Sequence, residues 1–238
     1  MQNWNLFFGI FIISSPILFA MIAFPDSIAW SWNEGRGGYF FALVFVVAEL
    51  IGLKIVISKK RLFSVIPIAL LVISYLISLE YGLREFLIES ATHFDVQLIY
   101  SWTWMWDFVV MAIFIVVGLT IFFGKRWIRI APAGPIFLSG TAIILSLDAF
   151  FPYDTLGPLQ YVVPYFVQAN VWLVTFLDLG TAIARDNIMF LRGDHGSMAL
   201  QVFWPSAGVH SIIIFSLVIG AFMLKMNIPR NRKIIYFI

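Results

Sequence analysis

Residues 156–180 read LGPLQYVVPYFVQANVWLVTFLDLG, and the fold depends on whether this stretch crosses a membrane. It is apolar enough to resemble a span, but prolines and polar side chains interrupt it at Pro158, Gln160, Pro164, Gln168, Asn170 and Asp178. If it crossed, the next apolar run, 207–225, would point outward and leave the four positive charges that follow outside. If it lies in the interface or re-enters, those charges stay with the other basic loops. The second arrangement is favoured, because basic loops collect on the cytoplasmic side.

The composition of the whole chain indicates a polytopic membrane protein. Of the 238 residues, 61% are hydrophobic and 12% are charged, and the mean hydropathy is +0.95. A soluble domain of this length needs more charge on its surface. Several runs approach the ~20 residues that a bilayer core requires. The first, from about Phe7 to Phe24, has no basic flank and no small-residue cleavage site, so we interpret it as a retained span and not as a signal peptide.

Six apolar runs are predicted as transmembrane helices, and the sequence therefore predicts an all-α fold. Their approximate bounds are 5–24, 38–57, 62–79, 107–124, 134–151 and 207–225. With 156–180 as an interfacial or re-entrant segment, the chain is expected to form a single membrane domain over residues 1–238. The sequence contains no internal repeat and no low-complexity tract.

The positions of the basic residues predict the orientation. Three connections carry most of them: Lys59 to Arg61, Lys125 to Arg129, and Lys225 to Lys233. These loops and the amino terminus are expected to be cytoplasmic. Eleven of the fifteen Lys and Arg then lie in or beside cytoplasmic loops, and four lie outside. The expected location is the cell membrane, with residues 203–211 on the outer side.

A short extracytoplasmic hairpin is predicted over residues 187–204. The segments NIMFL and SMALQVFW flank a polar turn, RGDHGS, whose two glycines suit a tight reversal. The unpaired backbone N–H and C=O groups of such a hairpin cannot face lipid, so they must be covered by protein or exposed to water.

Charge and cysteine content exclude several functions. The net charge of +2 is too small to indicate a nucleic-acid partner. Because the chain has no cysteine, it has no disulfide, no thiolate metal site and no thiol nucleophile. His93 and the acidic loop residues show no repeated His spacing, so we predict no metal site and no cofactor.

The stretch FWPSAGVHS, residues 203–211, is the first candidate for chemistry. Ser206 and Gly208 form a small-residue turn directly before an apolar helix. Backbone N–H groups at a helix amino terminus stabilise an oxyanion and raise the reactivity of a nucleophile. Spacing alone favours a simpler interpretation, in which Ser206 caps the helix after Pro205.

Two histidines are candidates for the general base. His210 lies four residues after Ser206, so the two share a face of the predicted helix. His195 lies in the polar turn on the same predicted side of the membrane. The alternatives are a hydrogen-bonded interfacial histidine and a solvated turn residue.

Two arginines are candidates for contacts with a substrate or an anion. Arg185 and Arg192 are two of the four predicted outside cations, and a guanidinium suits a carboxylate, a phosphate or a lipid head group. Pairing with the neighbouring Asp186 or Asp194 explains them equally well.

Three acidic residues lie at membrane depth in the predicted topology. Glu49 lies within a span, and Asp107 and Asp148 lie near span ends. Ionisable groups in such places are functional candidates by default. A buried ion pair or a protonated carboxyl is the alternative.

Two segments carry a family resemblance. Residues 177–193 read LDLGTAIARDNIMFLRG, and residues 200–211 read LQVFWPSAGVHS. They follow the order of an apolar segment, a Gly-containing turn, an Arg, an Asn-x-Ile-x-Leu-like strand, and a signature that opens an apolar helix. This pattern resembles the exosortase/archaeosortase family of membrane transpeptidase-like proteases. The likeness covers roughly the last third of the chain and is only architectural before that.

The resemblance places Ser206 on the position of the family's nucleophilic Cys. Such a serine variant looks like those expected of archaea, the thaumarchaeosortases. The family's catalytic Arg and His lie in later spans, and the sequence stops at Ile238 before either, as if truncated at the carboxy terminus. Neither His210 nor His195 matches the family's histidine.

The resemblance implies an enzyme that processes secreted proteins at the outer membrane surface. The substrates would carry a carboxy-terminal sorting signal, composed of a short motif, a hydrophobic helix and a basic cluster. The enzyme would cut between the motif and the helix and pass the new terminus to a membrane lipid. The alternative is a catalytically inactive protein of the same fold that acts as a structural or accessory subunit of a membrane complex.

Overall fold

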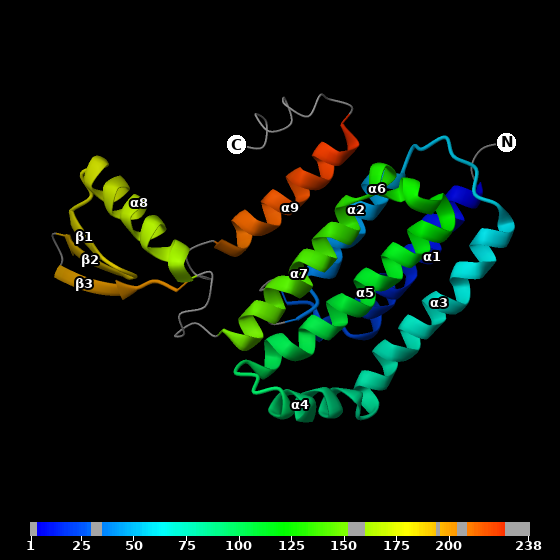
Figure 1. Cartoon of the computed structure of the whole chain (residues 1–238), viewed down its shortest axis with the longest axis horizontal. Coiled ribbons are helices and arrows are strands. Elements are labelled where there is room, and N and C mark those ends of the chain that lie inside the picture. Colours follow the sequence, from blue (N-terminus) through cyan, green and yellow to red (C-terminus); the bar gives the residue numbers. More distant parts are fainter. Residues whose placement is uncertain (1–3, 30–34, 152–159, 194–195, 204–208, 227–238) are drawn as a thin grey trace. The chain divides into compact units, whose positions relative to one another are not determined.

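The computed structural model describes residues 4–29, 35–151, 160–193, 196–203 and 209–226, and over 209–212 it describes the backbone only. The chain divides into two compact units. The first is a helical bundle formed by the residues up to Ala149 and those from Ile214 onward, and the second, Phe150–Ile213, combines a helix with a small sheet (Figure 1). The expectation of a single membrane domain over residues 1–238 stays a prediction, and the two units are described separately below.

The bundle is built from long apolar helices joined by short helical turns. In chain order these are α1 (Trp4–Ala23), η1 (Pro25–Ser27), α2 (Gly38–Leu50), α3 (Lys59–Ser78), η2 (Leu79–Tyr81), α4 (Leu83–His93), α5 (Ile99–Phe123), η3 (Gly124–Arg126), α6 (Trp127–Ile130), α7 (Ala133–Phe150) and α9 (Val209–Lys225).

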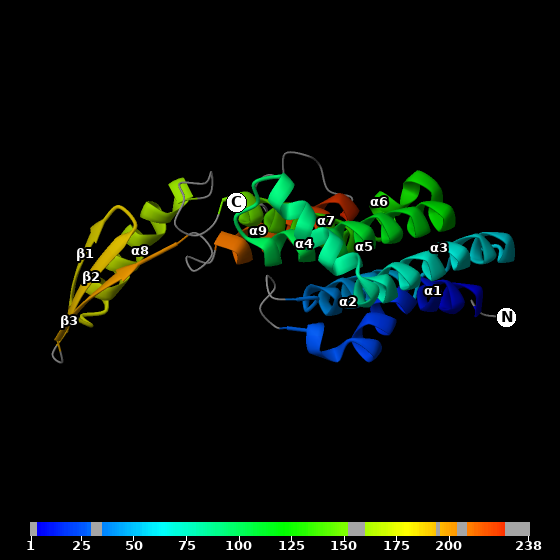
Figure 2. The same cartoon turned by 90° about the horizontal axis from the view of Figure 1, so that it is seen from below.

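The core of the bundle lies where α1, α3 and α5 pack against one another, side by side in Figure 2. Ile13 of α1, Val65 of α3 and Ile115 of α5 are fully buried there. Large apolar side chains also point outward: Phe8 is 60% exposed and Leu71 is 68% exposed. An outer surface of this kind suits lipid and not water, because a soluble protein buries such side chains.

Four helical stretches in the described part of the chain are long and apolar enough to cross a membrane: Trp4–Ala23, Lys59–Tyr81, Ile99–Ile130 and Ala133–Phe150. They support the predicted membrane location. The other two predicted spans correspond to shorter apolar helices, α2 with 13 residues and α9 with 17.

The structure corrects the bounds of two predicted segments. The predicted span 38–57 ends as a helix at Leu50, and Gly52 then adopts φ +81°. That conformation favours glycine and does not continue a right-handed helix. The predicted loop 80–106 instead contains α4 and the first two turns of α5, which begins at Ile99.

The second unit contains a three-stranded antiparallel sheet, of which the sequence predicted only one hairpin. The strands are β1 (Thr181–Arg185), β2 (Ile188–Gly193) and β3 (Gly196–Gln201), in the order β1-β2-β3. β2 and β3 form the predicted hairpin. β1 is an additional strand, joined to β2 by the two-residue turn Asp186-Asn187, in which Asp186 has φ 52°.

Helix α8 (Val163–Phe176), preceded by η4 (Gln160–Val162), packs on β1 of this sheet. It buries Val163, Val167 and Val171, which lie four residues apart and therefore on one face. With 14 residues it is shorter than the ~20 that a span requires, so segment 156–180 contains no described helix of spanning length.

Candidate functional site

Arg185 and Arg192 lie on the same face of the sheet but far apart along it. Arg192 is the cross-strand partner of Thr181, and alternation along β1 places Thr181 and Arg185 on one face. Their positions along the strand direction differ by four residues, or about 13 Å. Neither arginine takes part in the ion pairs found among the described residues. No carboxylate of the described residues thus occupies either guanidinium, and the sheet does not hold the two as one clamp.

The sheet face between the two arginines is apolar. Ile183 and its cross-strand partner Phe190 are 68% and 43% exposed. A shallow depression of about 380 Å³ covers this part of the sheet, and its lining includes Thr181, Ile183, Phe190, Arg192, Ser197 and Ala199. The face therefore offers an exposed apolar centre with a cation, Arg192, at the edge of the depression.

Gly180 fixes the start of β1. Its φ of +146° is a conformation that L side chains rarely adopt, and a Cβ at this position would lie 2.6 Å from the backbone oxygen of Arg192. The Thr181 hydroxyl donates a hydrogen bond of 3.4 Å to that same oxygen. The glycine of the sequence motif thus has a local structural role, the close approach of two backbones.

The predicted nucleophile lies between the last strand and the last described helix. β3 ends at Gln201, and α9 begins at Val209. Ser206, Gly208 and His195 fall outside the described residues. His210 is the second residue of α9. Of the predicted site residues, the structure places only the two arginines by their side chains.

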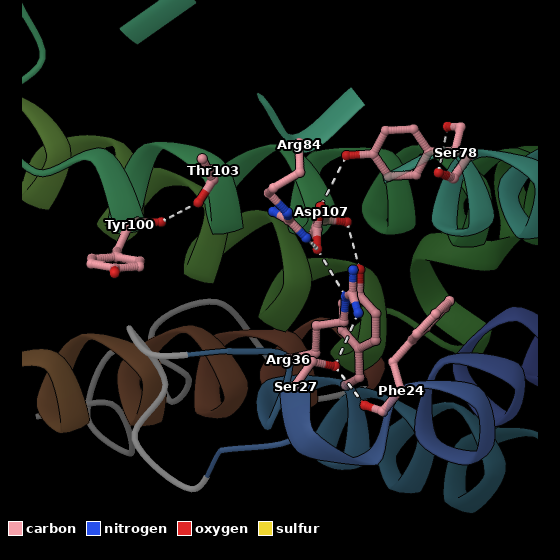
Figure 3. Close-up of polar contacts among 10 residues, drawn as sticks. Phe24, Ser27, Arg36, Ser78, Arg84, Tyr100, Thr103 and Asp107 are labelled. Atoms are coloured by element: carbon pink, nitrogen blue, oxygen red, sulfur yellow. Dashed lines mark hydrogen bonds and ion pairs between the residues drawn. The ribbon is translucent and has the colours of Figure 1, made fainter. Parts of the chain in front are cut away.

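A second group of ionisable residues lies in the helical bundle, centred on the fully buried Asp107 of α5 (Figure 3). Its Oδ2 accepts hydrogen bonds from Arg36 Nε at 2.8 Å and from Arg84 Nη2 at 3.0 Å. Its Oδ1 accepts one from the Tyr75 hydroxyl at 3.0 Å. The sequence singled out Asp107, and these contacts favour the interpretation of a buried ion pair.

The partners of Asp107 come from several helix ends. Arg36 lies just before α2, Tyr75 lies in the last turn of α3, and Arg84 lies in the first turn of α4. Figure 3 shows Arg36 and Arg84 reaching the carboxylate from different sides. The Tyr39 hydroxyl donates to the backbone oxygen of Asp107 at 2.8 Å. One carboxylate thereby ties together the ends of α2, α3 and α4.

The two other acidic residues have different partners. Asp148 Oδ2 accepts a hydrogen bond of 2.8 Å from the Ser101 hydroxyl. Glu49 Oε2 accepts one of 2.9 Å from the backbone N–H of Ala133, and Oε1 pairs with Lys225 Nζ at 3.2 Å. Because Ala133 begins α7, Glu49 places negative charge at a helix amino terminus, which is favourable.

Basic residues collect at the other end of α5. A groove of about 820 Å³ is lined by Lys125, Arg126 and Arg129, which follow α5, and by Lys225 at the end of α9. These residues belong to two of the three loops predicted to be cytoplasmic. The basic groove and the Asp107 cluster therefore lie toward opposite ends of α5, and the orientation of the bundle in a membrane stays a prediction.

Sequence reasoning missed Arg36, Arg84 and Tyr75 as partners of Asp107. The sequence analysis placed both arginines among the four positive charges predicted on the outer side of the membrane, and gave them no partner. One signal was available, because only four positive charges are predicted on the outer side. A carboxylate at membrane depth, such as Asp107, is expected to pair with one of them.

No group of three or more metal-ligating side chains lies together among the described residues. In the comparisons with known proteins, no family model, curated protein or solved structure matches this chain.

Proposed function

We propose that this chain is a membrane peptidase or transpeptidase of the exosortase/archaeosortase type, with Ser206 in the nucleophile position. The observation that carries the proposal is the order of elements around the motif. A strand begins directly after Asn187, a second ends at Gln201, and an apolar helix begins directly after Gly208. This is the order of strand and helix that the resemblance implies for the signature.

In the proposed reaction, the Ser206 hydroxyl attacks the carbonyl carbon of the peptide bond that follows the sorting motif. A base takes the hydroxyl proton, the C–N bond breaks, and a proton passes to the leaving amine. The acyl-serine ester is then attacked by water, which yields a carboxylic acid, or by a lipid hydroxyl, which yields a new ester. Either attack restores the Ser206 hydroxyl.

Serine requires more assistance than cysteine, because its hydroxyl has a far higher pKa than a thiol. His210 and His195 are the proposed candidates for the base that takes its proton. The N–H groups at Gly208 and the start of α9 are the proposed donors to the oxyanion. The exposed sheet face with Arg185 and Arg192 is the proposed contact for the extended sorting motif.

The experiment is a cleavage assay in membranes that contain the full chain and a tagged secreted protein with a carboxy-terminal sorting signal. We expect Ser206→Ala to abolish processing and Ser206→Cys to retain it, because a thiol is the better nucleophile. Ser64→Ala is the matched control, since Ser64 is an exposed serine on α3, outside the sheet and the signature, and it should cleave normally. Normal cleavage by Ser206→Ala would refute the assignment of Ser206.

The alternative is an inactive protein of the same fold that serves as an accessory subunit of a membrane complex. The serine in place of the family's cysteine favours this alternative. It predicts that Ser206→Ala leaves processing unchanged while deletion of the whole chain changes the composition of a membrane complex. The same assay, combined with co-purification, therefore separates the two functions.

A further inference from the structure

The cluster around Asp107 contains more positive than negative charge. Arg36 and Arg84 share this single carboxylate, and the side chain of Arg36 is 1% exposed while that of Arg84 is 20% exposed. Among the described residues, no other acidic side chain pairs with either arginine. An unbalanced cation is strongly unfavourable at such depth in a membrane protein, so a second negative group is expected.

The cluster also has hydrogen-bond donors without acceptors. Arg36 Nη2, Arg84 Nη1 and the indole Nε1 of Trp104 are buried and lack a partner among the described residues. The acceptors nearby are in use: both oxygens of Asp107 are bonded, and Ser27 Oγ accepts from Arg36 Nη1 at 2.9 Å. Since buried polar groups are normally satisfied, three unmatched donors point to a missing acceptor.

The two arginines of the cluster lie close together. The two guanidinium groups bond the same oxygen, so the two bonding nitrogens lie within about 6 Å of each other. The guanidinium carbons of both arginines also lie over the Trp104 ring, 5.4 Å from its centroid for Arg36 and 4.4 Å for Arg84. A cation over an aromatic ring is attracted by the negative face of that ring, so Trp104 helps to hold both arginines in place.

We propose that Arg36, Arg84 and Trp104 bind one oxyanion, a phosphate or a carboxylate, at this end of the bundle. Such a group supplies both the missing negative charge and several acceptor oxygens. The partly exposed Arg84 gives access from the surroundings. The source is either a lipid head group or a soluble anion, and the site is independent of Ser206 and of the proposed proteolysis.

The test uses the full chain in nanodiscs and measures the apparent Tm. In one arm the discs contain only phosphatidylcholine and inorganic phosphate is titrated, and in the other a fifth of the lipid is replaced by phosphatidylglycerol. A saturable rise in Tm is expected in at least one arm. A rise with inorganic phosphate indicates a soluble anion, and a rise only with phosphatidylglycerol indicates a lipid head group.

Variants of two arginines decide whether the effect belongs to this site. Arg84→Gln should weaken the response at least 10-fold, and Arg84→Lys, which keeps the charge but loses the planar fork, should weaken it less and remain folded. Arg61→Gln is the matched control, because Arg61 is another arginine that donates a hydrogen bond to α5, but to the backbone oxygen of Phe122 at 2.9 Å, at the other end of that helix. It should respond as the unaltered chain does.

Two results would overturn the proposal. One is the absence of a saturable response in both arms, or a response that Arg84→Gln leaves unchanged. The other concerns Glu34, which precedes Arg36 by two residues and lies outside the described residues. If only the Glu34→Gln variant binds phosphate, the missing acceptor is that carboxylate and not an external anion.

Discussion

Gly180 is a residue of the second unit at which a side chain would clash with the sheet. We expect Gly180→Ala to lower the stability of this unit by about 1–3 kcal/mol, because a Cβ at φ +146° would meet the Arg192 oxygen. The apparent Tm and the rate of limited proteolysis at the β1–β2 turn measure the effect.

Gly193→Ala is the control for this substitution. Gly193 lies at the end of β2, has no positive φ, and a Cβ there would have nothing within 4 Å. Its stability change should stay within about 0.5 kcal/mol. Equal effects of the two substitutions would show that the close approach at Gly180 carries no strain.

Single residues also show what the sequence can and cannot predict. Asp107 was identified because a carboxylate at membrane depth requires an explanation. Its partner Arg36 lies 71 residues away in the chain, and no local pattern connects the two. The opposite holds for Arg185 and Arg192, which are close in sequence and which the strand register separates along the sheet.

At the scale of elements, the start of α7 depends on Glu49. We expect Glu49→Ala to destabilise the bundle by about 2–3 kcal/mol, because it leaves the buried N–H of Ala133 without an acceptor. Glu49→Gln keeps an acceptor oxygen and should cost less. Resistance to unfolding by a denaturing detergent ranks the variants.

The Lys225→Met variant removes the ion pair with Glu49 but keeps the hydrogen bond between Glu49 and the Ala133 N–H. The same measurement therefore gives the contribution of the ion pair alone. The Lys225 side chain is 30% exposed, so its pairing with Glu49 should contribute less than about 1 kcal/mol. If Lys225→Met costs as much as Glu49→Ala, then the ion pair and not the hydrogen bond to α7 stabilises this end of the bundle.

Element bounds show where hydrophobic periodicity suffices and where it does not. Long apolar runs predicted α1, α3 and α7 to within a few residues, since length and composition alone identify such helices. Helix α4 was missed because charged residues in LREFLIESATH are typical of a loop, although the segment still has helix-forming residues. Strand β1, TAIAR, was missed because five residues are too few to show a clear alternation of apolar and polar side chains.

At the scale of the whole molecule, the orientation in the membrane is the main prediction. The chain has no cysteine, so a single introduced cysteine can be labelled without background. With a membrane-impermeant maleimide on intact cells, we expect His195→Cys to be labelled and Lys125→Cys to be protected, because basic loops stay inside. Permeabilised cells, in which both positions react, provide the control. Labelling of both positions or of neither in intact cells contradicts the orientation.

The position of Asp107 also constrains how the bundle is made. Arg36 and Arg84 precede Asp107 by 71 and 23 residues, so both are synthesised before their shared carboxylate. The first helices therefore enter the membrane with two cations that lack this partner. Their contacts with Asp107 can form only after α5 has been synthesised, so the ends of α2, α3 and α4 reach their final packing late.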